Sequence, residues 1–296
     1  MSSVAMQSGS RWRPLLRSLG RSPKALIGGA IVLLLVLVAV FAPWIAPNDP
    51  LSQDLLSPLL PPAWMADGTA QYPLGTDSLG RCVLSRLIFG SRVALWVGLC
   101  SAVGTMLLGC ALALLGSYFG GKVDRGISYL VDLWMSFPPV VLSLILMVGL
   151  GPGVGNVILS VVLVDWTRFC RVVRAEALVI RRRDYVVASR LMGFSHLRIM
   201  LREMLPGLVP LIITLFSLEM GVAIVVEAIL SFVGLSVPAS TVAWGVMIAD
   251  ARGYMQENIW NLIPPVCGIV VTVLGFNLLS DGLRQALDPR ANTSRV

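Results

Sequence analysis

The sequence is poor in charged residues. Asp, Glu, Lys and Arg make up 13% of its 296 residues, whereas hydrophobic residues make up 56%. An ordinary soluble domain carries about 25% charged residues. Because so little polar material cannot cover a water-exposed surface, the composition argues against a soluble fold and indicates one helical membrane unit whose polar parts are loops.

Residues that usually carry chemistry are also scarce. The chain has one histidine, His196, and neither an HExxH sequence nor a Cys/His cluster, which argues against a metal-dependent membrane enzyme. No GxSxG sequence marks a nucleophile. The five cysteines are scattered without a CxxC pair and indicate no disulfide framework. We therefore expect no catalytic residue, no bound metal and no enzymatic activity.

One phosphate-binding sequence is a false match. Gly116 to Lys122 reads GSYFGGK, which fits the GxxxxGK part of a phosphate-binding loop. Such a loop needs Ser or Thr at the next position to hold magnesium, and a strand before the first glycine. Val123 follows here and a long apolar segment precedes. The sequence therefore predicts no bound cofactor, and any ATP-driven work must come from another subunit.

Long uncharged segments dominate the chain. Residues 25–45 carry no charge, and a helix of 21 residues spans about 31 Å, close to the thickness of a hydrocarbon core. This segment is too long for the apolar part of a cleaved signal peptide. The further candidate spans are 93–117, 127–150, 156–170, 207–234 and 260–283. The pattern predicts an all-α polytopic membrane protein with six transmembrane helices.

The positive charges predict the orientation of these helices. With the N-terminus inside, the inner segments hold 19 Lys and Arg residues and the outer loops hold 4. Short basic loops stay in the cytoplasm. We therefore expect both termini in the cytoplasm. The charge distribution also explains the net charge of +7 without a nucleic-acid partner.

Six spans divide the chain into segments of different character. The predicted segments are a basic N-terminal segment (1–24), a first transmembrane helix (25–46), an external loop (47–92), a five-helix core (93–290) and a cytoplasmic tail (291–296). Within the external loop, apolar residues between Ser78 and Ile88 form one helical stripe. This stripe predicts an amphipathic helix in the outer membrane interface.

A basic loop, residues 171–206, is the most informative polar segment. Asp184 to Met192 favours a helix, Gly193 suits a left-handed C-cap, and Ser195 can cap a second short helix. Pro206 is expected to end that helix and begin the next span. The sequence predicts a helix-Gly-helix elbow at the cytoplasmic surface, or else a solvated loop that only sets topology.

The elbow resembles the ATPase-coupling loop of importer-type ABC permeases. The run from Asp184 to Gly193, followed by Leu205-Pro206, carries the likeness, although Val187 replaces the usual Glu and Glu203 the usual Ile. In that family a short helix of this loop docks on an ATPase subunit. The resemblance implies coupling contacts from Asp184, Tyr185, Ala188, Ser189, Arg190, Gly193, Leu205 and Pro206.

Three further stretches resemble the dipeptide/oligopeptide/nickel branch of these permeases, in its second subunit type. They are 74–92, in which Cys82 replaces a usual Asp, 227–245 and 276–290. The resemblance implies import of di- or oligopeptides across the inner membrane of a bacterium, with nickel or a metal chelate as the alternative cargo. It also implies as partners a homologous second permease, two cytoplasmic ABC ATPases that use ATP and magnesium, and an extracytoplasmic substrate-binding protein.

Acidic residues within apolar spans need a reason, because Asp at a helix centre costs about 2.5–3.5 kcal/mol. Asp165, Glu219 and Glu227 either line a translocation pathway or make contacts between helices or subunits. They also leave open an ion-coupled secondary transporter or channel. Pro138-Pro139 predicts a kink in the third span, since each proline lacks a backbone donor.

Overall fold

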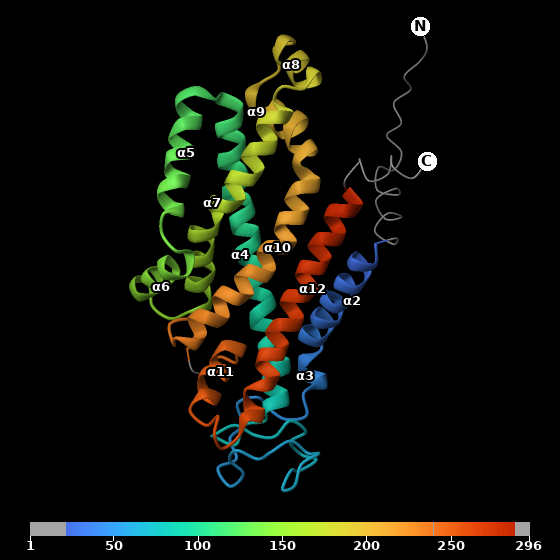
Figure 1. Ribbon diagram of the computed structural model, residues 1–296, viewed down its shortest axis with the longest axis vertical. Helices are drawn as coiled ribbons and strands as arrows, with labels where there is room; N and C mark the ends of the chain where they lie inside the picture. The colour runs from blue at the N-terminus through green and yellow to red at the C-terminus, as the bar shows by residue number, and fades with distance from the viewer. Residues whose placement is uncertain (1–21, 239, 288–296) are drawn as a thin grey trace.

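The computed structural model describes residues 22–238 and 240–287, and almost every element within them is a helix (Figure 1). The α-helices are α2 (Pro23–Val40), α3 (Ala42–Ile45), α4 (Val83–Phe119), α5 (Gly121–Met135), α6 (Pro139–Leu150), α7 (Val154–Ile180), α8 (Asp184–Leu191), α9 (His196–Arg198), α10 (Leu205–Phe232), α11 (Trp244–Arg252) and α12 (Ile263–Leu287). A π-helical segment, η1 (Ile199–Met204), and a 3₁₀ turn, η2 (Ile259–Asn261), complete the set. The predicted all-α fold is confirmed.

Four helical segments are long and apolar enough to cross a membrane. They are α2, α4, the continuous helix His196–Phe232 and the segment Ile259–Ala286. The helices α5 and α6 qualify together as a fifth, bent by 86° at the break between them. α7 has 27 residues but carries several charged side chains, and it is not among these spans. The described chain thus holds four or five candidate spans, and the count of six stays a prediction.

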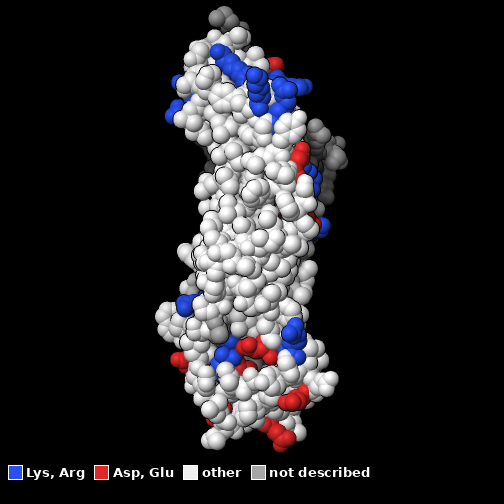
Figure 2. Space-filling model, turned by 90° about the vertical axis from the view of Figure 1, so that its left-hand side faces the viewer, with Lys and Arg blue, Asp and Glu red and all other residues white. Residues whose placement is uncertain are grey.

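Charged side chains gather at the two ends of the molecule. Figure 2 shows Lys and Arg at one end, a broad uncharged band across the middle, and mixed charges at the other end. The first end carries α8 and α9 and is called here the elbow end, and the second carries residues 46–82 and α11 and is called the loop end (Figure 1). An uncharged middle band is what a surface in contact with lipid requires.

Glycines hold α2 against α12. A Cβ atom at Gly28 would lie 2.3 Å from the backbone nitrogen of Leu279, and one at Gly282 would lie 2.4 Å from that of Ala25. Lipid is as apolar as the helices, so close backbone approach and packing replace the hydrophobic effect in such contacts. Any side chain at these two glycines would separate the helices.

The first predicted span, 25–45, is interrupted near its end. α2 ends at Val40 because Pro43 has no N–H group for the carbonyl of Ala39 four residues earlier. Arg92 of α4 satisfies that carbonyl instead, with its Nε donating to the Ala39 oxygen at 2.6 Å. The prediction of one uninterrupted helix was wrong at this position, and Arg92 compensates for the lost hydrogen bond.

The predicted interfacial helix at 78–88 was wrong in its first half. Asp77 accepts hydrogen bonds from the backbone nitrogens of Leu79 and Arg81, both at 2.9 Å, and so closes a turn. The helix begins only at Val83 and continues as α4. Residues 83–88 are helical as part of α4 and bury Ser85 and Arg86, and the local hydrogen bonds of Asp77 prevent helix before Val83.

The predicted fourth span, 156–170, ends later in the chain than expected. α7 continues to Ile180, so the first ten residues of the predicted loop 171–206 are helical. Two of the arginines that suggested a loop, Arg171 and Arg174, lie on α7 and pair with acidic residues of α5, Arg171 with Asp132 at 2.5 Å and Arg174 with Asp124 at 2.6 Å. Paired charges allow the helix to extend where isolated charges would argue for a loop.

The expectation that Pro206 ends a helix was also wrong. The helix runs without interruption from His196 to Phe232. The π-helical turns of η1 lie directly before Pro206. In an α-helix the carbonyl of Arg202 would accept a hydrogen bond from the backbone nitrogen of residue 206, which carries no hydrogen in proline. The i to i+5 bonding of a π-helix does not need that bond. A local change of helix type therefore accommodates the proline.

Candidate functional site

The elbow is a short helix that ends in a tight reversal at Gly193. Gly193 has φ +76°, as the predicted left-handed cap requires. Its N–H donates to Arg190 O at 3.0 Å, and the N–H of Phe194 donates to Ser189 O at 3.2 Å. These two bonds form a Schellman motif. Ser195 occupies the N-cap position of α9, but its hydroxyl makes no capping bond within the described chain.

The elbow is fixed to the end of α4 through Tyr118. The Arg190 guanidinium lies 4.3 Å from the centre of the Tyr118 ring, and its Nη2 donates to Tyr118 O at 3.1 Å. The Tyr118 hydroxyl is 2.7 Å from Nδ1 of His196 on α9. Arg181 adds a bond to the neighbouring carbonyl of Ser117 at 2.9 Å. Both arms of the elbow are therefore attached to one residue of a long helix.

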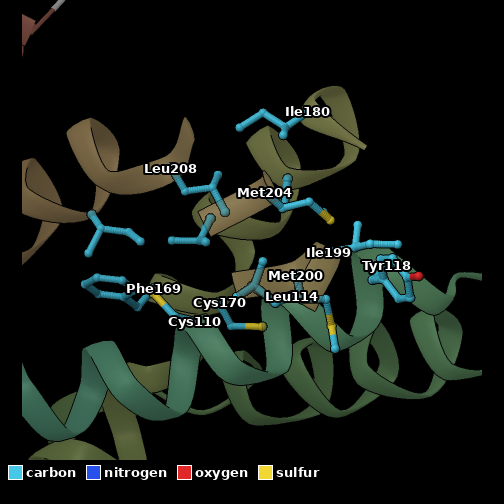
Figure 3. Packing of buried hydrophobic residues seen from close by; sticks show 14 of the residues in the cluster. Cys110, Leu114, Tyr118, Phe169, Cys170, Ile180, Ile199, Met200, Met204 and Leu208 are labelled. Carbon is cyan, nitrogen blue, oxygen red and sulfur yellow. The ribbon is translucent and has the colours of Figure 1, made fainter. Parts of the chain in front are cut away.

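Below the elbow, η1 packs into the groove between α4 and α7. Ile199, Met200 and Met204 are buried there. Figure 3 shows these side chains among Leu114 and Tyr118 of α4 and Ile180 of α7. Close packing of this kind transmits displacement, because interiors have few voids to absorb it. A movement of the elbow must therefore move both helices.

The outer face of the elbow is apolar and uncovered. Leu191 is 84% exposed, and Met192 and Leu197 are each 63% exposed. Exposed arginines flank these side chains: Arg182, Arg183, Arg198 and Arg202. A contiguous exposed apolar surface with a charged rim marks a site for another protein. The elbow end is therefore the candidate docking surface of the described chain.

The predicted coupling residues divide between this surface and the interior. Asp184, Tyr185, Ala188, Gly193 and Pro206 are exposed, whereas Ser189 is buried and Arg190 and Leu205 are half-buried. The Ser189 hydroxyl donates within α8 to Tyr185 O at 2.9 Å. The exposed residues are accessible at the surface, whereas the buried and half-buried ones pack against the rest of the chain.

A second polar group lies inside the helix bundle. Nη2 of Arg168 on α7 is 3.2 Å from Oδ1 of Asp165 and 3.1 Å from Oε2 of Glu219 on α10. The side chains of Asp165 and Glu219 are 8% and 4% exposed, whereas that of Arg168 is 41% exposed. Sequence reasoning selected the two acids but counted Arg168 only among the cytoplasmic positive charges. The spacing of three residues between Asp165 and Arg168 was the available signal.

Two members of this ionic group, Asp165 and Arg168, line a cavity of about 470 Å³, and Glu219 lies behind them. Asp165, Thr167, Arg168 and Asn277 supply its polar atoms, and Trp134 and Phe137 are among its apolar walls. Binding pockets of about 300–1,000 Å³ with few polar groups are typical of small-molecule sites. The arrangement can hold a solute with one charged end and an apolar body.

The break between α5 and α6 forms one edge of the cavity. α5 ends at Met135 and α6 begins at Pro139, with the bend of 86° between them. Phe137 and Pro139 line the cavity at this break. Pro138 and Pro139 cannot donate backbone hydrogen bonds, so helical bonding stops here. The prolines thus widen the space beside Asp165.

Glu227 lies apart from this cavity. Its Oε1 accepts hydrogen bonds from the hydroxyls of Ser231 at 2.5 Å and Ser236 at 3.4 Å. The side chain is buried, and Ser236 O also accepts from the backbone nitrogen of Gly153. The structure therefore does not bring Glu227 together with Glu219, and it gives Glu227 a role in joining α10 to the start of α7.

At the loop end, four charged residues join two distant segments. Asp77 pairs with Arg81 at 2.7 Å and with Arg86, and Arg81 reaches Asp250 of α11 at 3.1 Å. Nε of Arg86 is buried without a hydrogen-bond partner among the described residues. Sequence reasoning missed these pairs, because Asp250 lies 169 residues from Arg81. The cluster fastens the segment before α4 to α11.

The chain is similar to known membrane transport proteins over nearly its whole length. Residues 105–293 match the family described as binding-protein-dependent transport system inner membrane component, and residues 10–62 match the N-terminal TM domain of oligopeptide transport permease C.

Three curated relatives show how far the likeness extends. The di/tripeptide transport system permease protein of Pseudomonas aeruginosa is 40% identical over 268 residues, 90% of this chain and 88% of the relative. The dipeptide transport system permease protein of Haemophilus influenzae is 38% identical over 90% of each chain. The nickel transport system permease protein of Escherichia coli is 36% identical over 90% of this chain and 94% of the relative.

Proposed function

Because this chain belongs to the family of binding-protein-dependent transport system inner membrane components, we propose that it is the permease subunit of an ATP-driven peptide importer. A homologous second permease completes the pathway, two cytoplasmic ATPases hydrolyse ATP with magnesium, and a binding protein delivers the cargo outside. The chain itself catalyses no covalent step and binds no cofactor. The observation that carries this proposal is the elbow, whose uncovered apolar face is rigidly attached to α4.

The proposed topology has six spans with the elbow end in the cytoplasm. Arginines crowd that end, as the positive-inside rule requires. Lys24 at the start of α2 pairs with Asp281 near the end of α12 at 3.2 Å, which supports both termini on one side. α7 supplies the sixth span, since its 27 residues reach about 40 Å and its charges are paired with acids of α5 and α10.

The elbow couples the ATPases to the membrane helices. Leu191, Met192 and Leu197 would enter a cleft on the ATPase, while the flanking arginines meet its acidic rim. A ligand shifts a conformational equilibrium only by its differential affinity for the two states. The ATPases must therefore hold the elbow differently with and without nucleotide, and Tyr118 passes that difference to α4.

Peptides are the proposed cargo. The first two relatives described above carry di/tripeptide and dipeptide transport in their names, which favours peptides, and the nickel permease of Escherichia coli makes nickel or a chelate the alternative. Asp165 and Arg168 line a cavity large enough for a short peptide. We place the translocation pathway along this cavity and leave Glu227 outside it.

The test is reconstitution in proteoliposomes. The chain is combined with the second permease, the ATPases and the binding protein, and uptake of labelled tri-alanine and of nickel is measured with and without ATP. We expect uptake of the peptide only with ATP and all partners present. Uptake by this chain alone, driven by an ion gradient, would instead establish a secondary transporter. Calorimetry of the binding protein with both cargoes identifies the ligand independently.

A further inference from the structure

Beside the cavity, the arginine of α7 does not pair with a single acidic residue, as two other arginines of α7 do. Arg174 binds both oxygens of Asp124 at 2.6 Å, and Arg171 pairs with Asp132. Each of these arginines has one acidic residue. Arg168, the third of the series, stands between two acidic residues, and the described structure supplies no second cation there.

One carboxylate oxygen of this group is left without a partner. Oε1 of Glu219 is buried and has no hydrogen-bond partner among the described residues, whereas Oε2 bonds to Arg168. A buried acceptor without a donor costs about 1–3 kcal/mol, and more when it is charged. A buried group of this kind needs a physical explanation, and a donor that binds during function supplies one.

Arg168 is the accessible member of the group. Its side chain is 41% exposed and lines the cavity, and the acids beside it are almost fully covered. An exposed cation over two covered acids can leave them when another cation replaces it.

We propose that Asp165 and Glu219 form the binding site for the N-terminal ammonium group of the cargo peptide, and that Arg168 occupies this site when the pathway is empty. This inference rests on the proposed peptide cargo. An ammonium group offers three donors in a compact charge, which suits two acids with an unused oxygen. Arg168, once displaced, faces the cavity and attracts the carboxylate end or the carbonyl groups of the same peptide.

The cavity fits this class of cargo. Its volume of about 470 Å³ holds a short peptide, and Trp134 and Phe137 offer apolar contacts that do not select one side chain. Recognition of the ammonium group alone permits many sequences, as a general peptide pathway needs. Release follows when Arg168 returns to the acids, so that the site is never left with two unpaired carboxylates.

The test measures peptide binding by the assembled permease and ATPase complex in lipid nanodiscs, without the binding protein. The ligands are labelled tri-alanine and the same peptide acetylated at its N-terminus, which lacks only the charged ammonium. We expect tri-alanine to bind about tenfold more tightly or better, the effect of a charge-assisted contact. Equal binding of both peptides, or no binding of tri-alanine at millimolar concentration, overturns the proposal.

Substitutions separate recognition from a purely structural role. Glu219→Gln and Asp165→Asn should each reduce the preference for tri-alanine, whereas Arg168→Gln should increase it by removing the competing cation. Glu176→Gln, an exposed acid of the same helix, serves as the control. A structural role predicts equal losses for both peptides in all three variants. If the preference is absent but ATP-driven uptake persists, the ammonium site is wrong and the proposed importer stands.

Discussion

The Arg190 guanidinium lies over the ring of Tyr118 at 4.3 Å, and this contact joins the elbow to the last turn of α4. Cation–π contacts contribute about 0.5–2 kcal/mol, depending on burial. The same tyrosine holds His196 through its hydroxyl. The Tyr118 side chain thus contacts both α8 and α9 and couples their positions to α4, a helix of 37 residues.

Replacing Tyr118 should uncouple the elbow without removing it. Tyr118→Ala deletes the ring under Arg190 and the bond to His196, so we expect uptake per ATP to fall by about two- to thirtyfold, the range of residues that transmit coupling. Tyr118→Phe keeps the ring and should give a smaller loss. The measurement is peptide uptake and ATP hydrolysis in proteoliposomes.

Two results would contradict this role for Tyr118. One is unchanged uptake per ATP in Tyr118→Ala. The other is loss of ATPase association, which would make the residue part of the docking surface. Tyr129→Ala is the control, because Tyr129 is exposed and lies on α5 away from the elbow.

A bulky residue at Gly193 should disrupt docking on the ATPases. Its φ of +76° costs a β-branched residue about 1–2 kcal/mol, and Gly193 has open space around it, so backbone strain is the only obstacle. We expect Gly193→Val to reach the membrane in normal amounts but to lose co-purification of the ATPases. Gly193→Asn should be milder, because Asn tolerates this conformation.

The control for Gly193 is Gly126→Val. Gly126 is helical and also has open space around it, so only the backbone conformation differs. Deletion of 190–200 should reproduce the loss seen in Gly193→Val. Undiminished ATPase association in that deletion would show that the partner binds elsewhere.

Local features of the sequence predicted local structure well. The reversal at Gly193 depends on a conformation that glycine adopts freely, and helix formers before it made α8 predictable. Long apolar runs likewise located α2, α4 and α10, because membrane helices satisfy their own backbone hydrogen bonds. Their ends were less predictable where a distant residue compensates for a proline, as Arg92 does for Pro43.

The functional groups depend on contacts that no local pattern contains. Arg168 lies 51 residues before Glu219, and Tyr118 lies 78 residues before His196. Arg168 was counted among the cytoplasmic charges because several arginines follow it, although Asp165 lies one turn earlier on the same helix. The uninterrupted helix through Pro206 likewise depends on the π-helical turns of η1, whose buried side chains pack against α4 and α7.

Arg92 should be required only because Pro43 interrupts α2. Arg92→Gln leaves the carbonyl of Ala39 without its donor, which we expect to cost about 1–3 kcal/mol of stability. Pro43→Ala supplies an N–H group for that carbonyl, so adding it to Arg92→Gln should recover part of the loss. Thermal unfolding of the purified protein measures both. Additive losses in the double variant would show that Arg92 acts in another way.

The cluster at the loop end should control the attachment of residues 46–82 to the bundle. Arg86 is 2% exposed and faces Asp77 and Asp250, so Arg86→Gln leaves the buried carboxylate of Asp77 with one arginine fewer. Removing one partner of a buried pair costs about 3–5 kcal/mol. We expect proteases to cut the loop several-fold faster in this variant, while Arg252→Gln on α11, outside the cluster, stays resistant. Equal resistance of Arg86→Gln and the unsubstituted protein would mean that other contacts, such as Asn258 with Leu59 O at 2.9 Å, suffice to hold the loop.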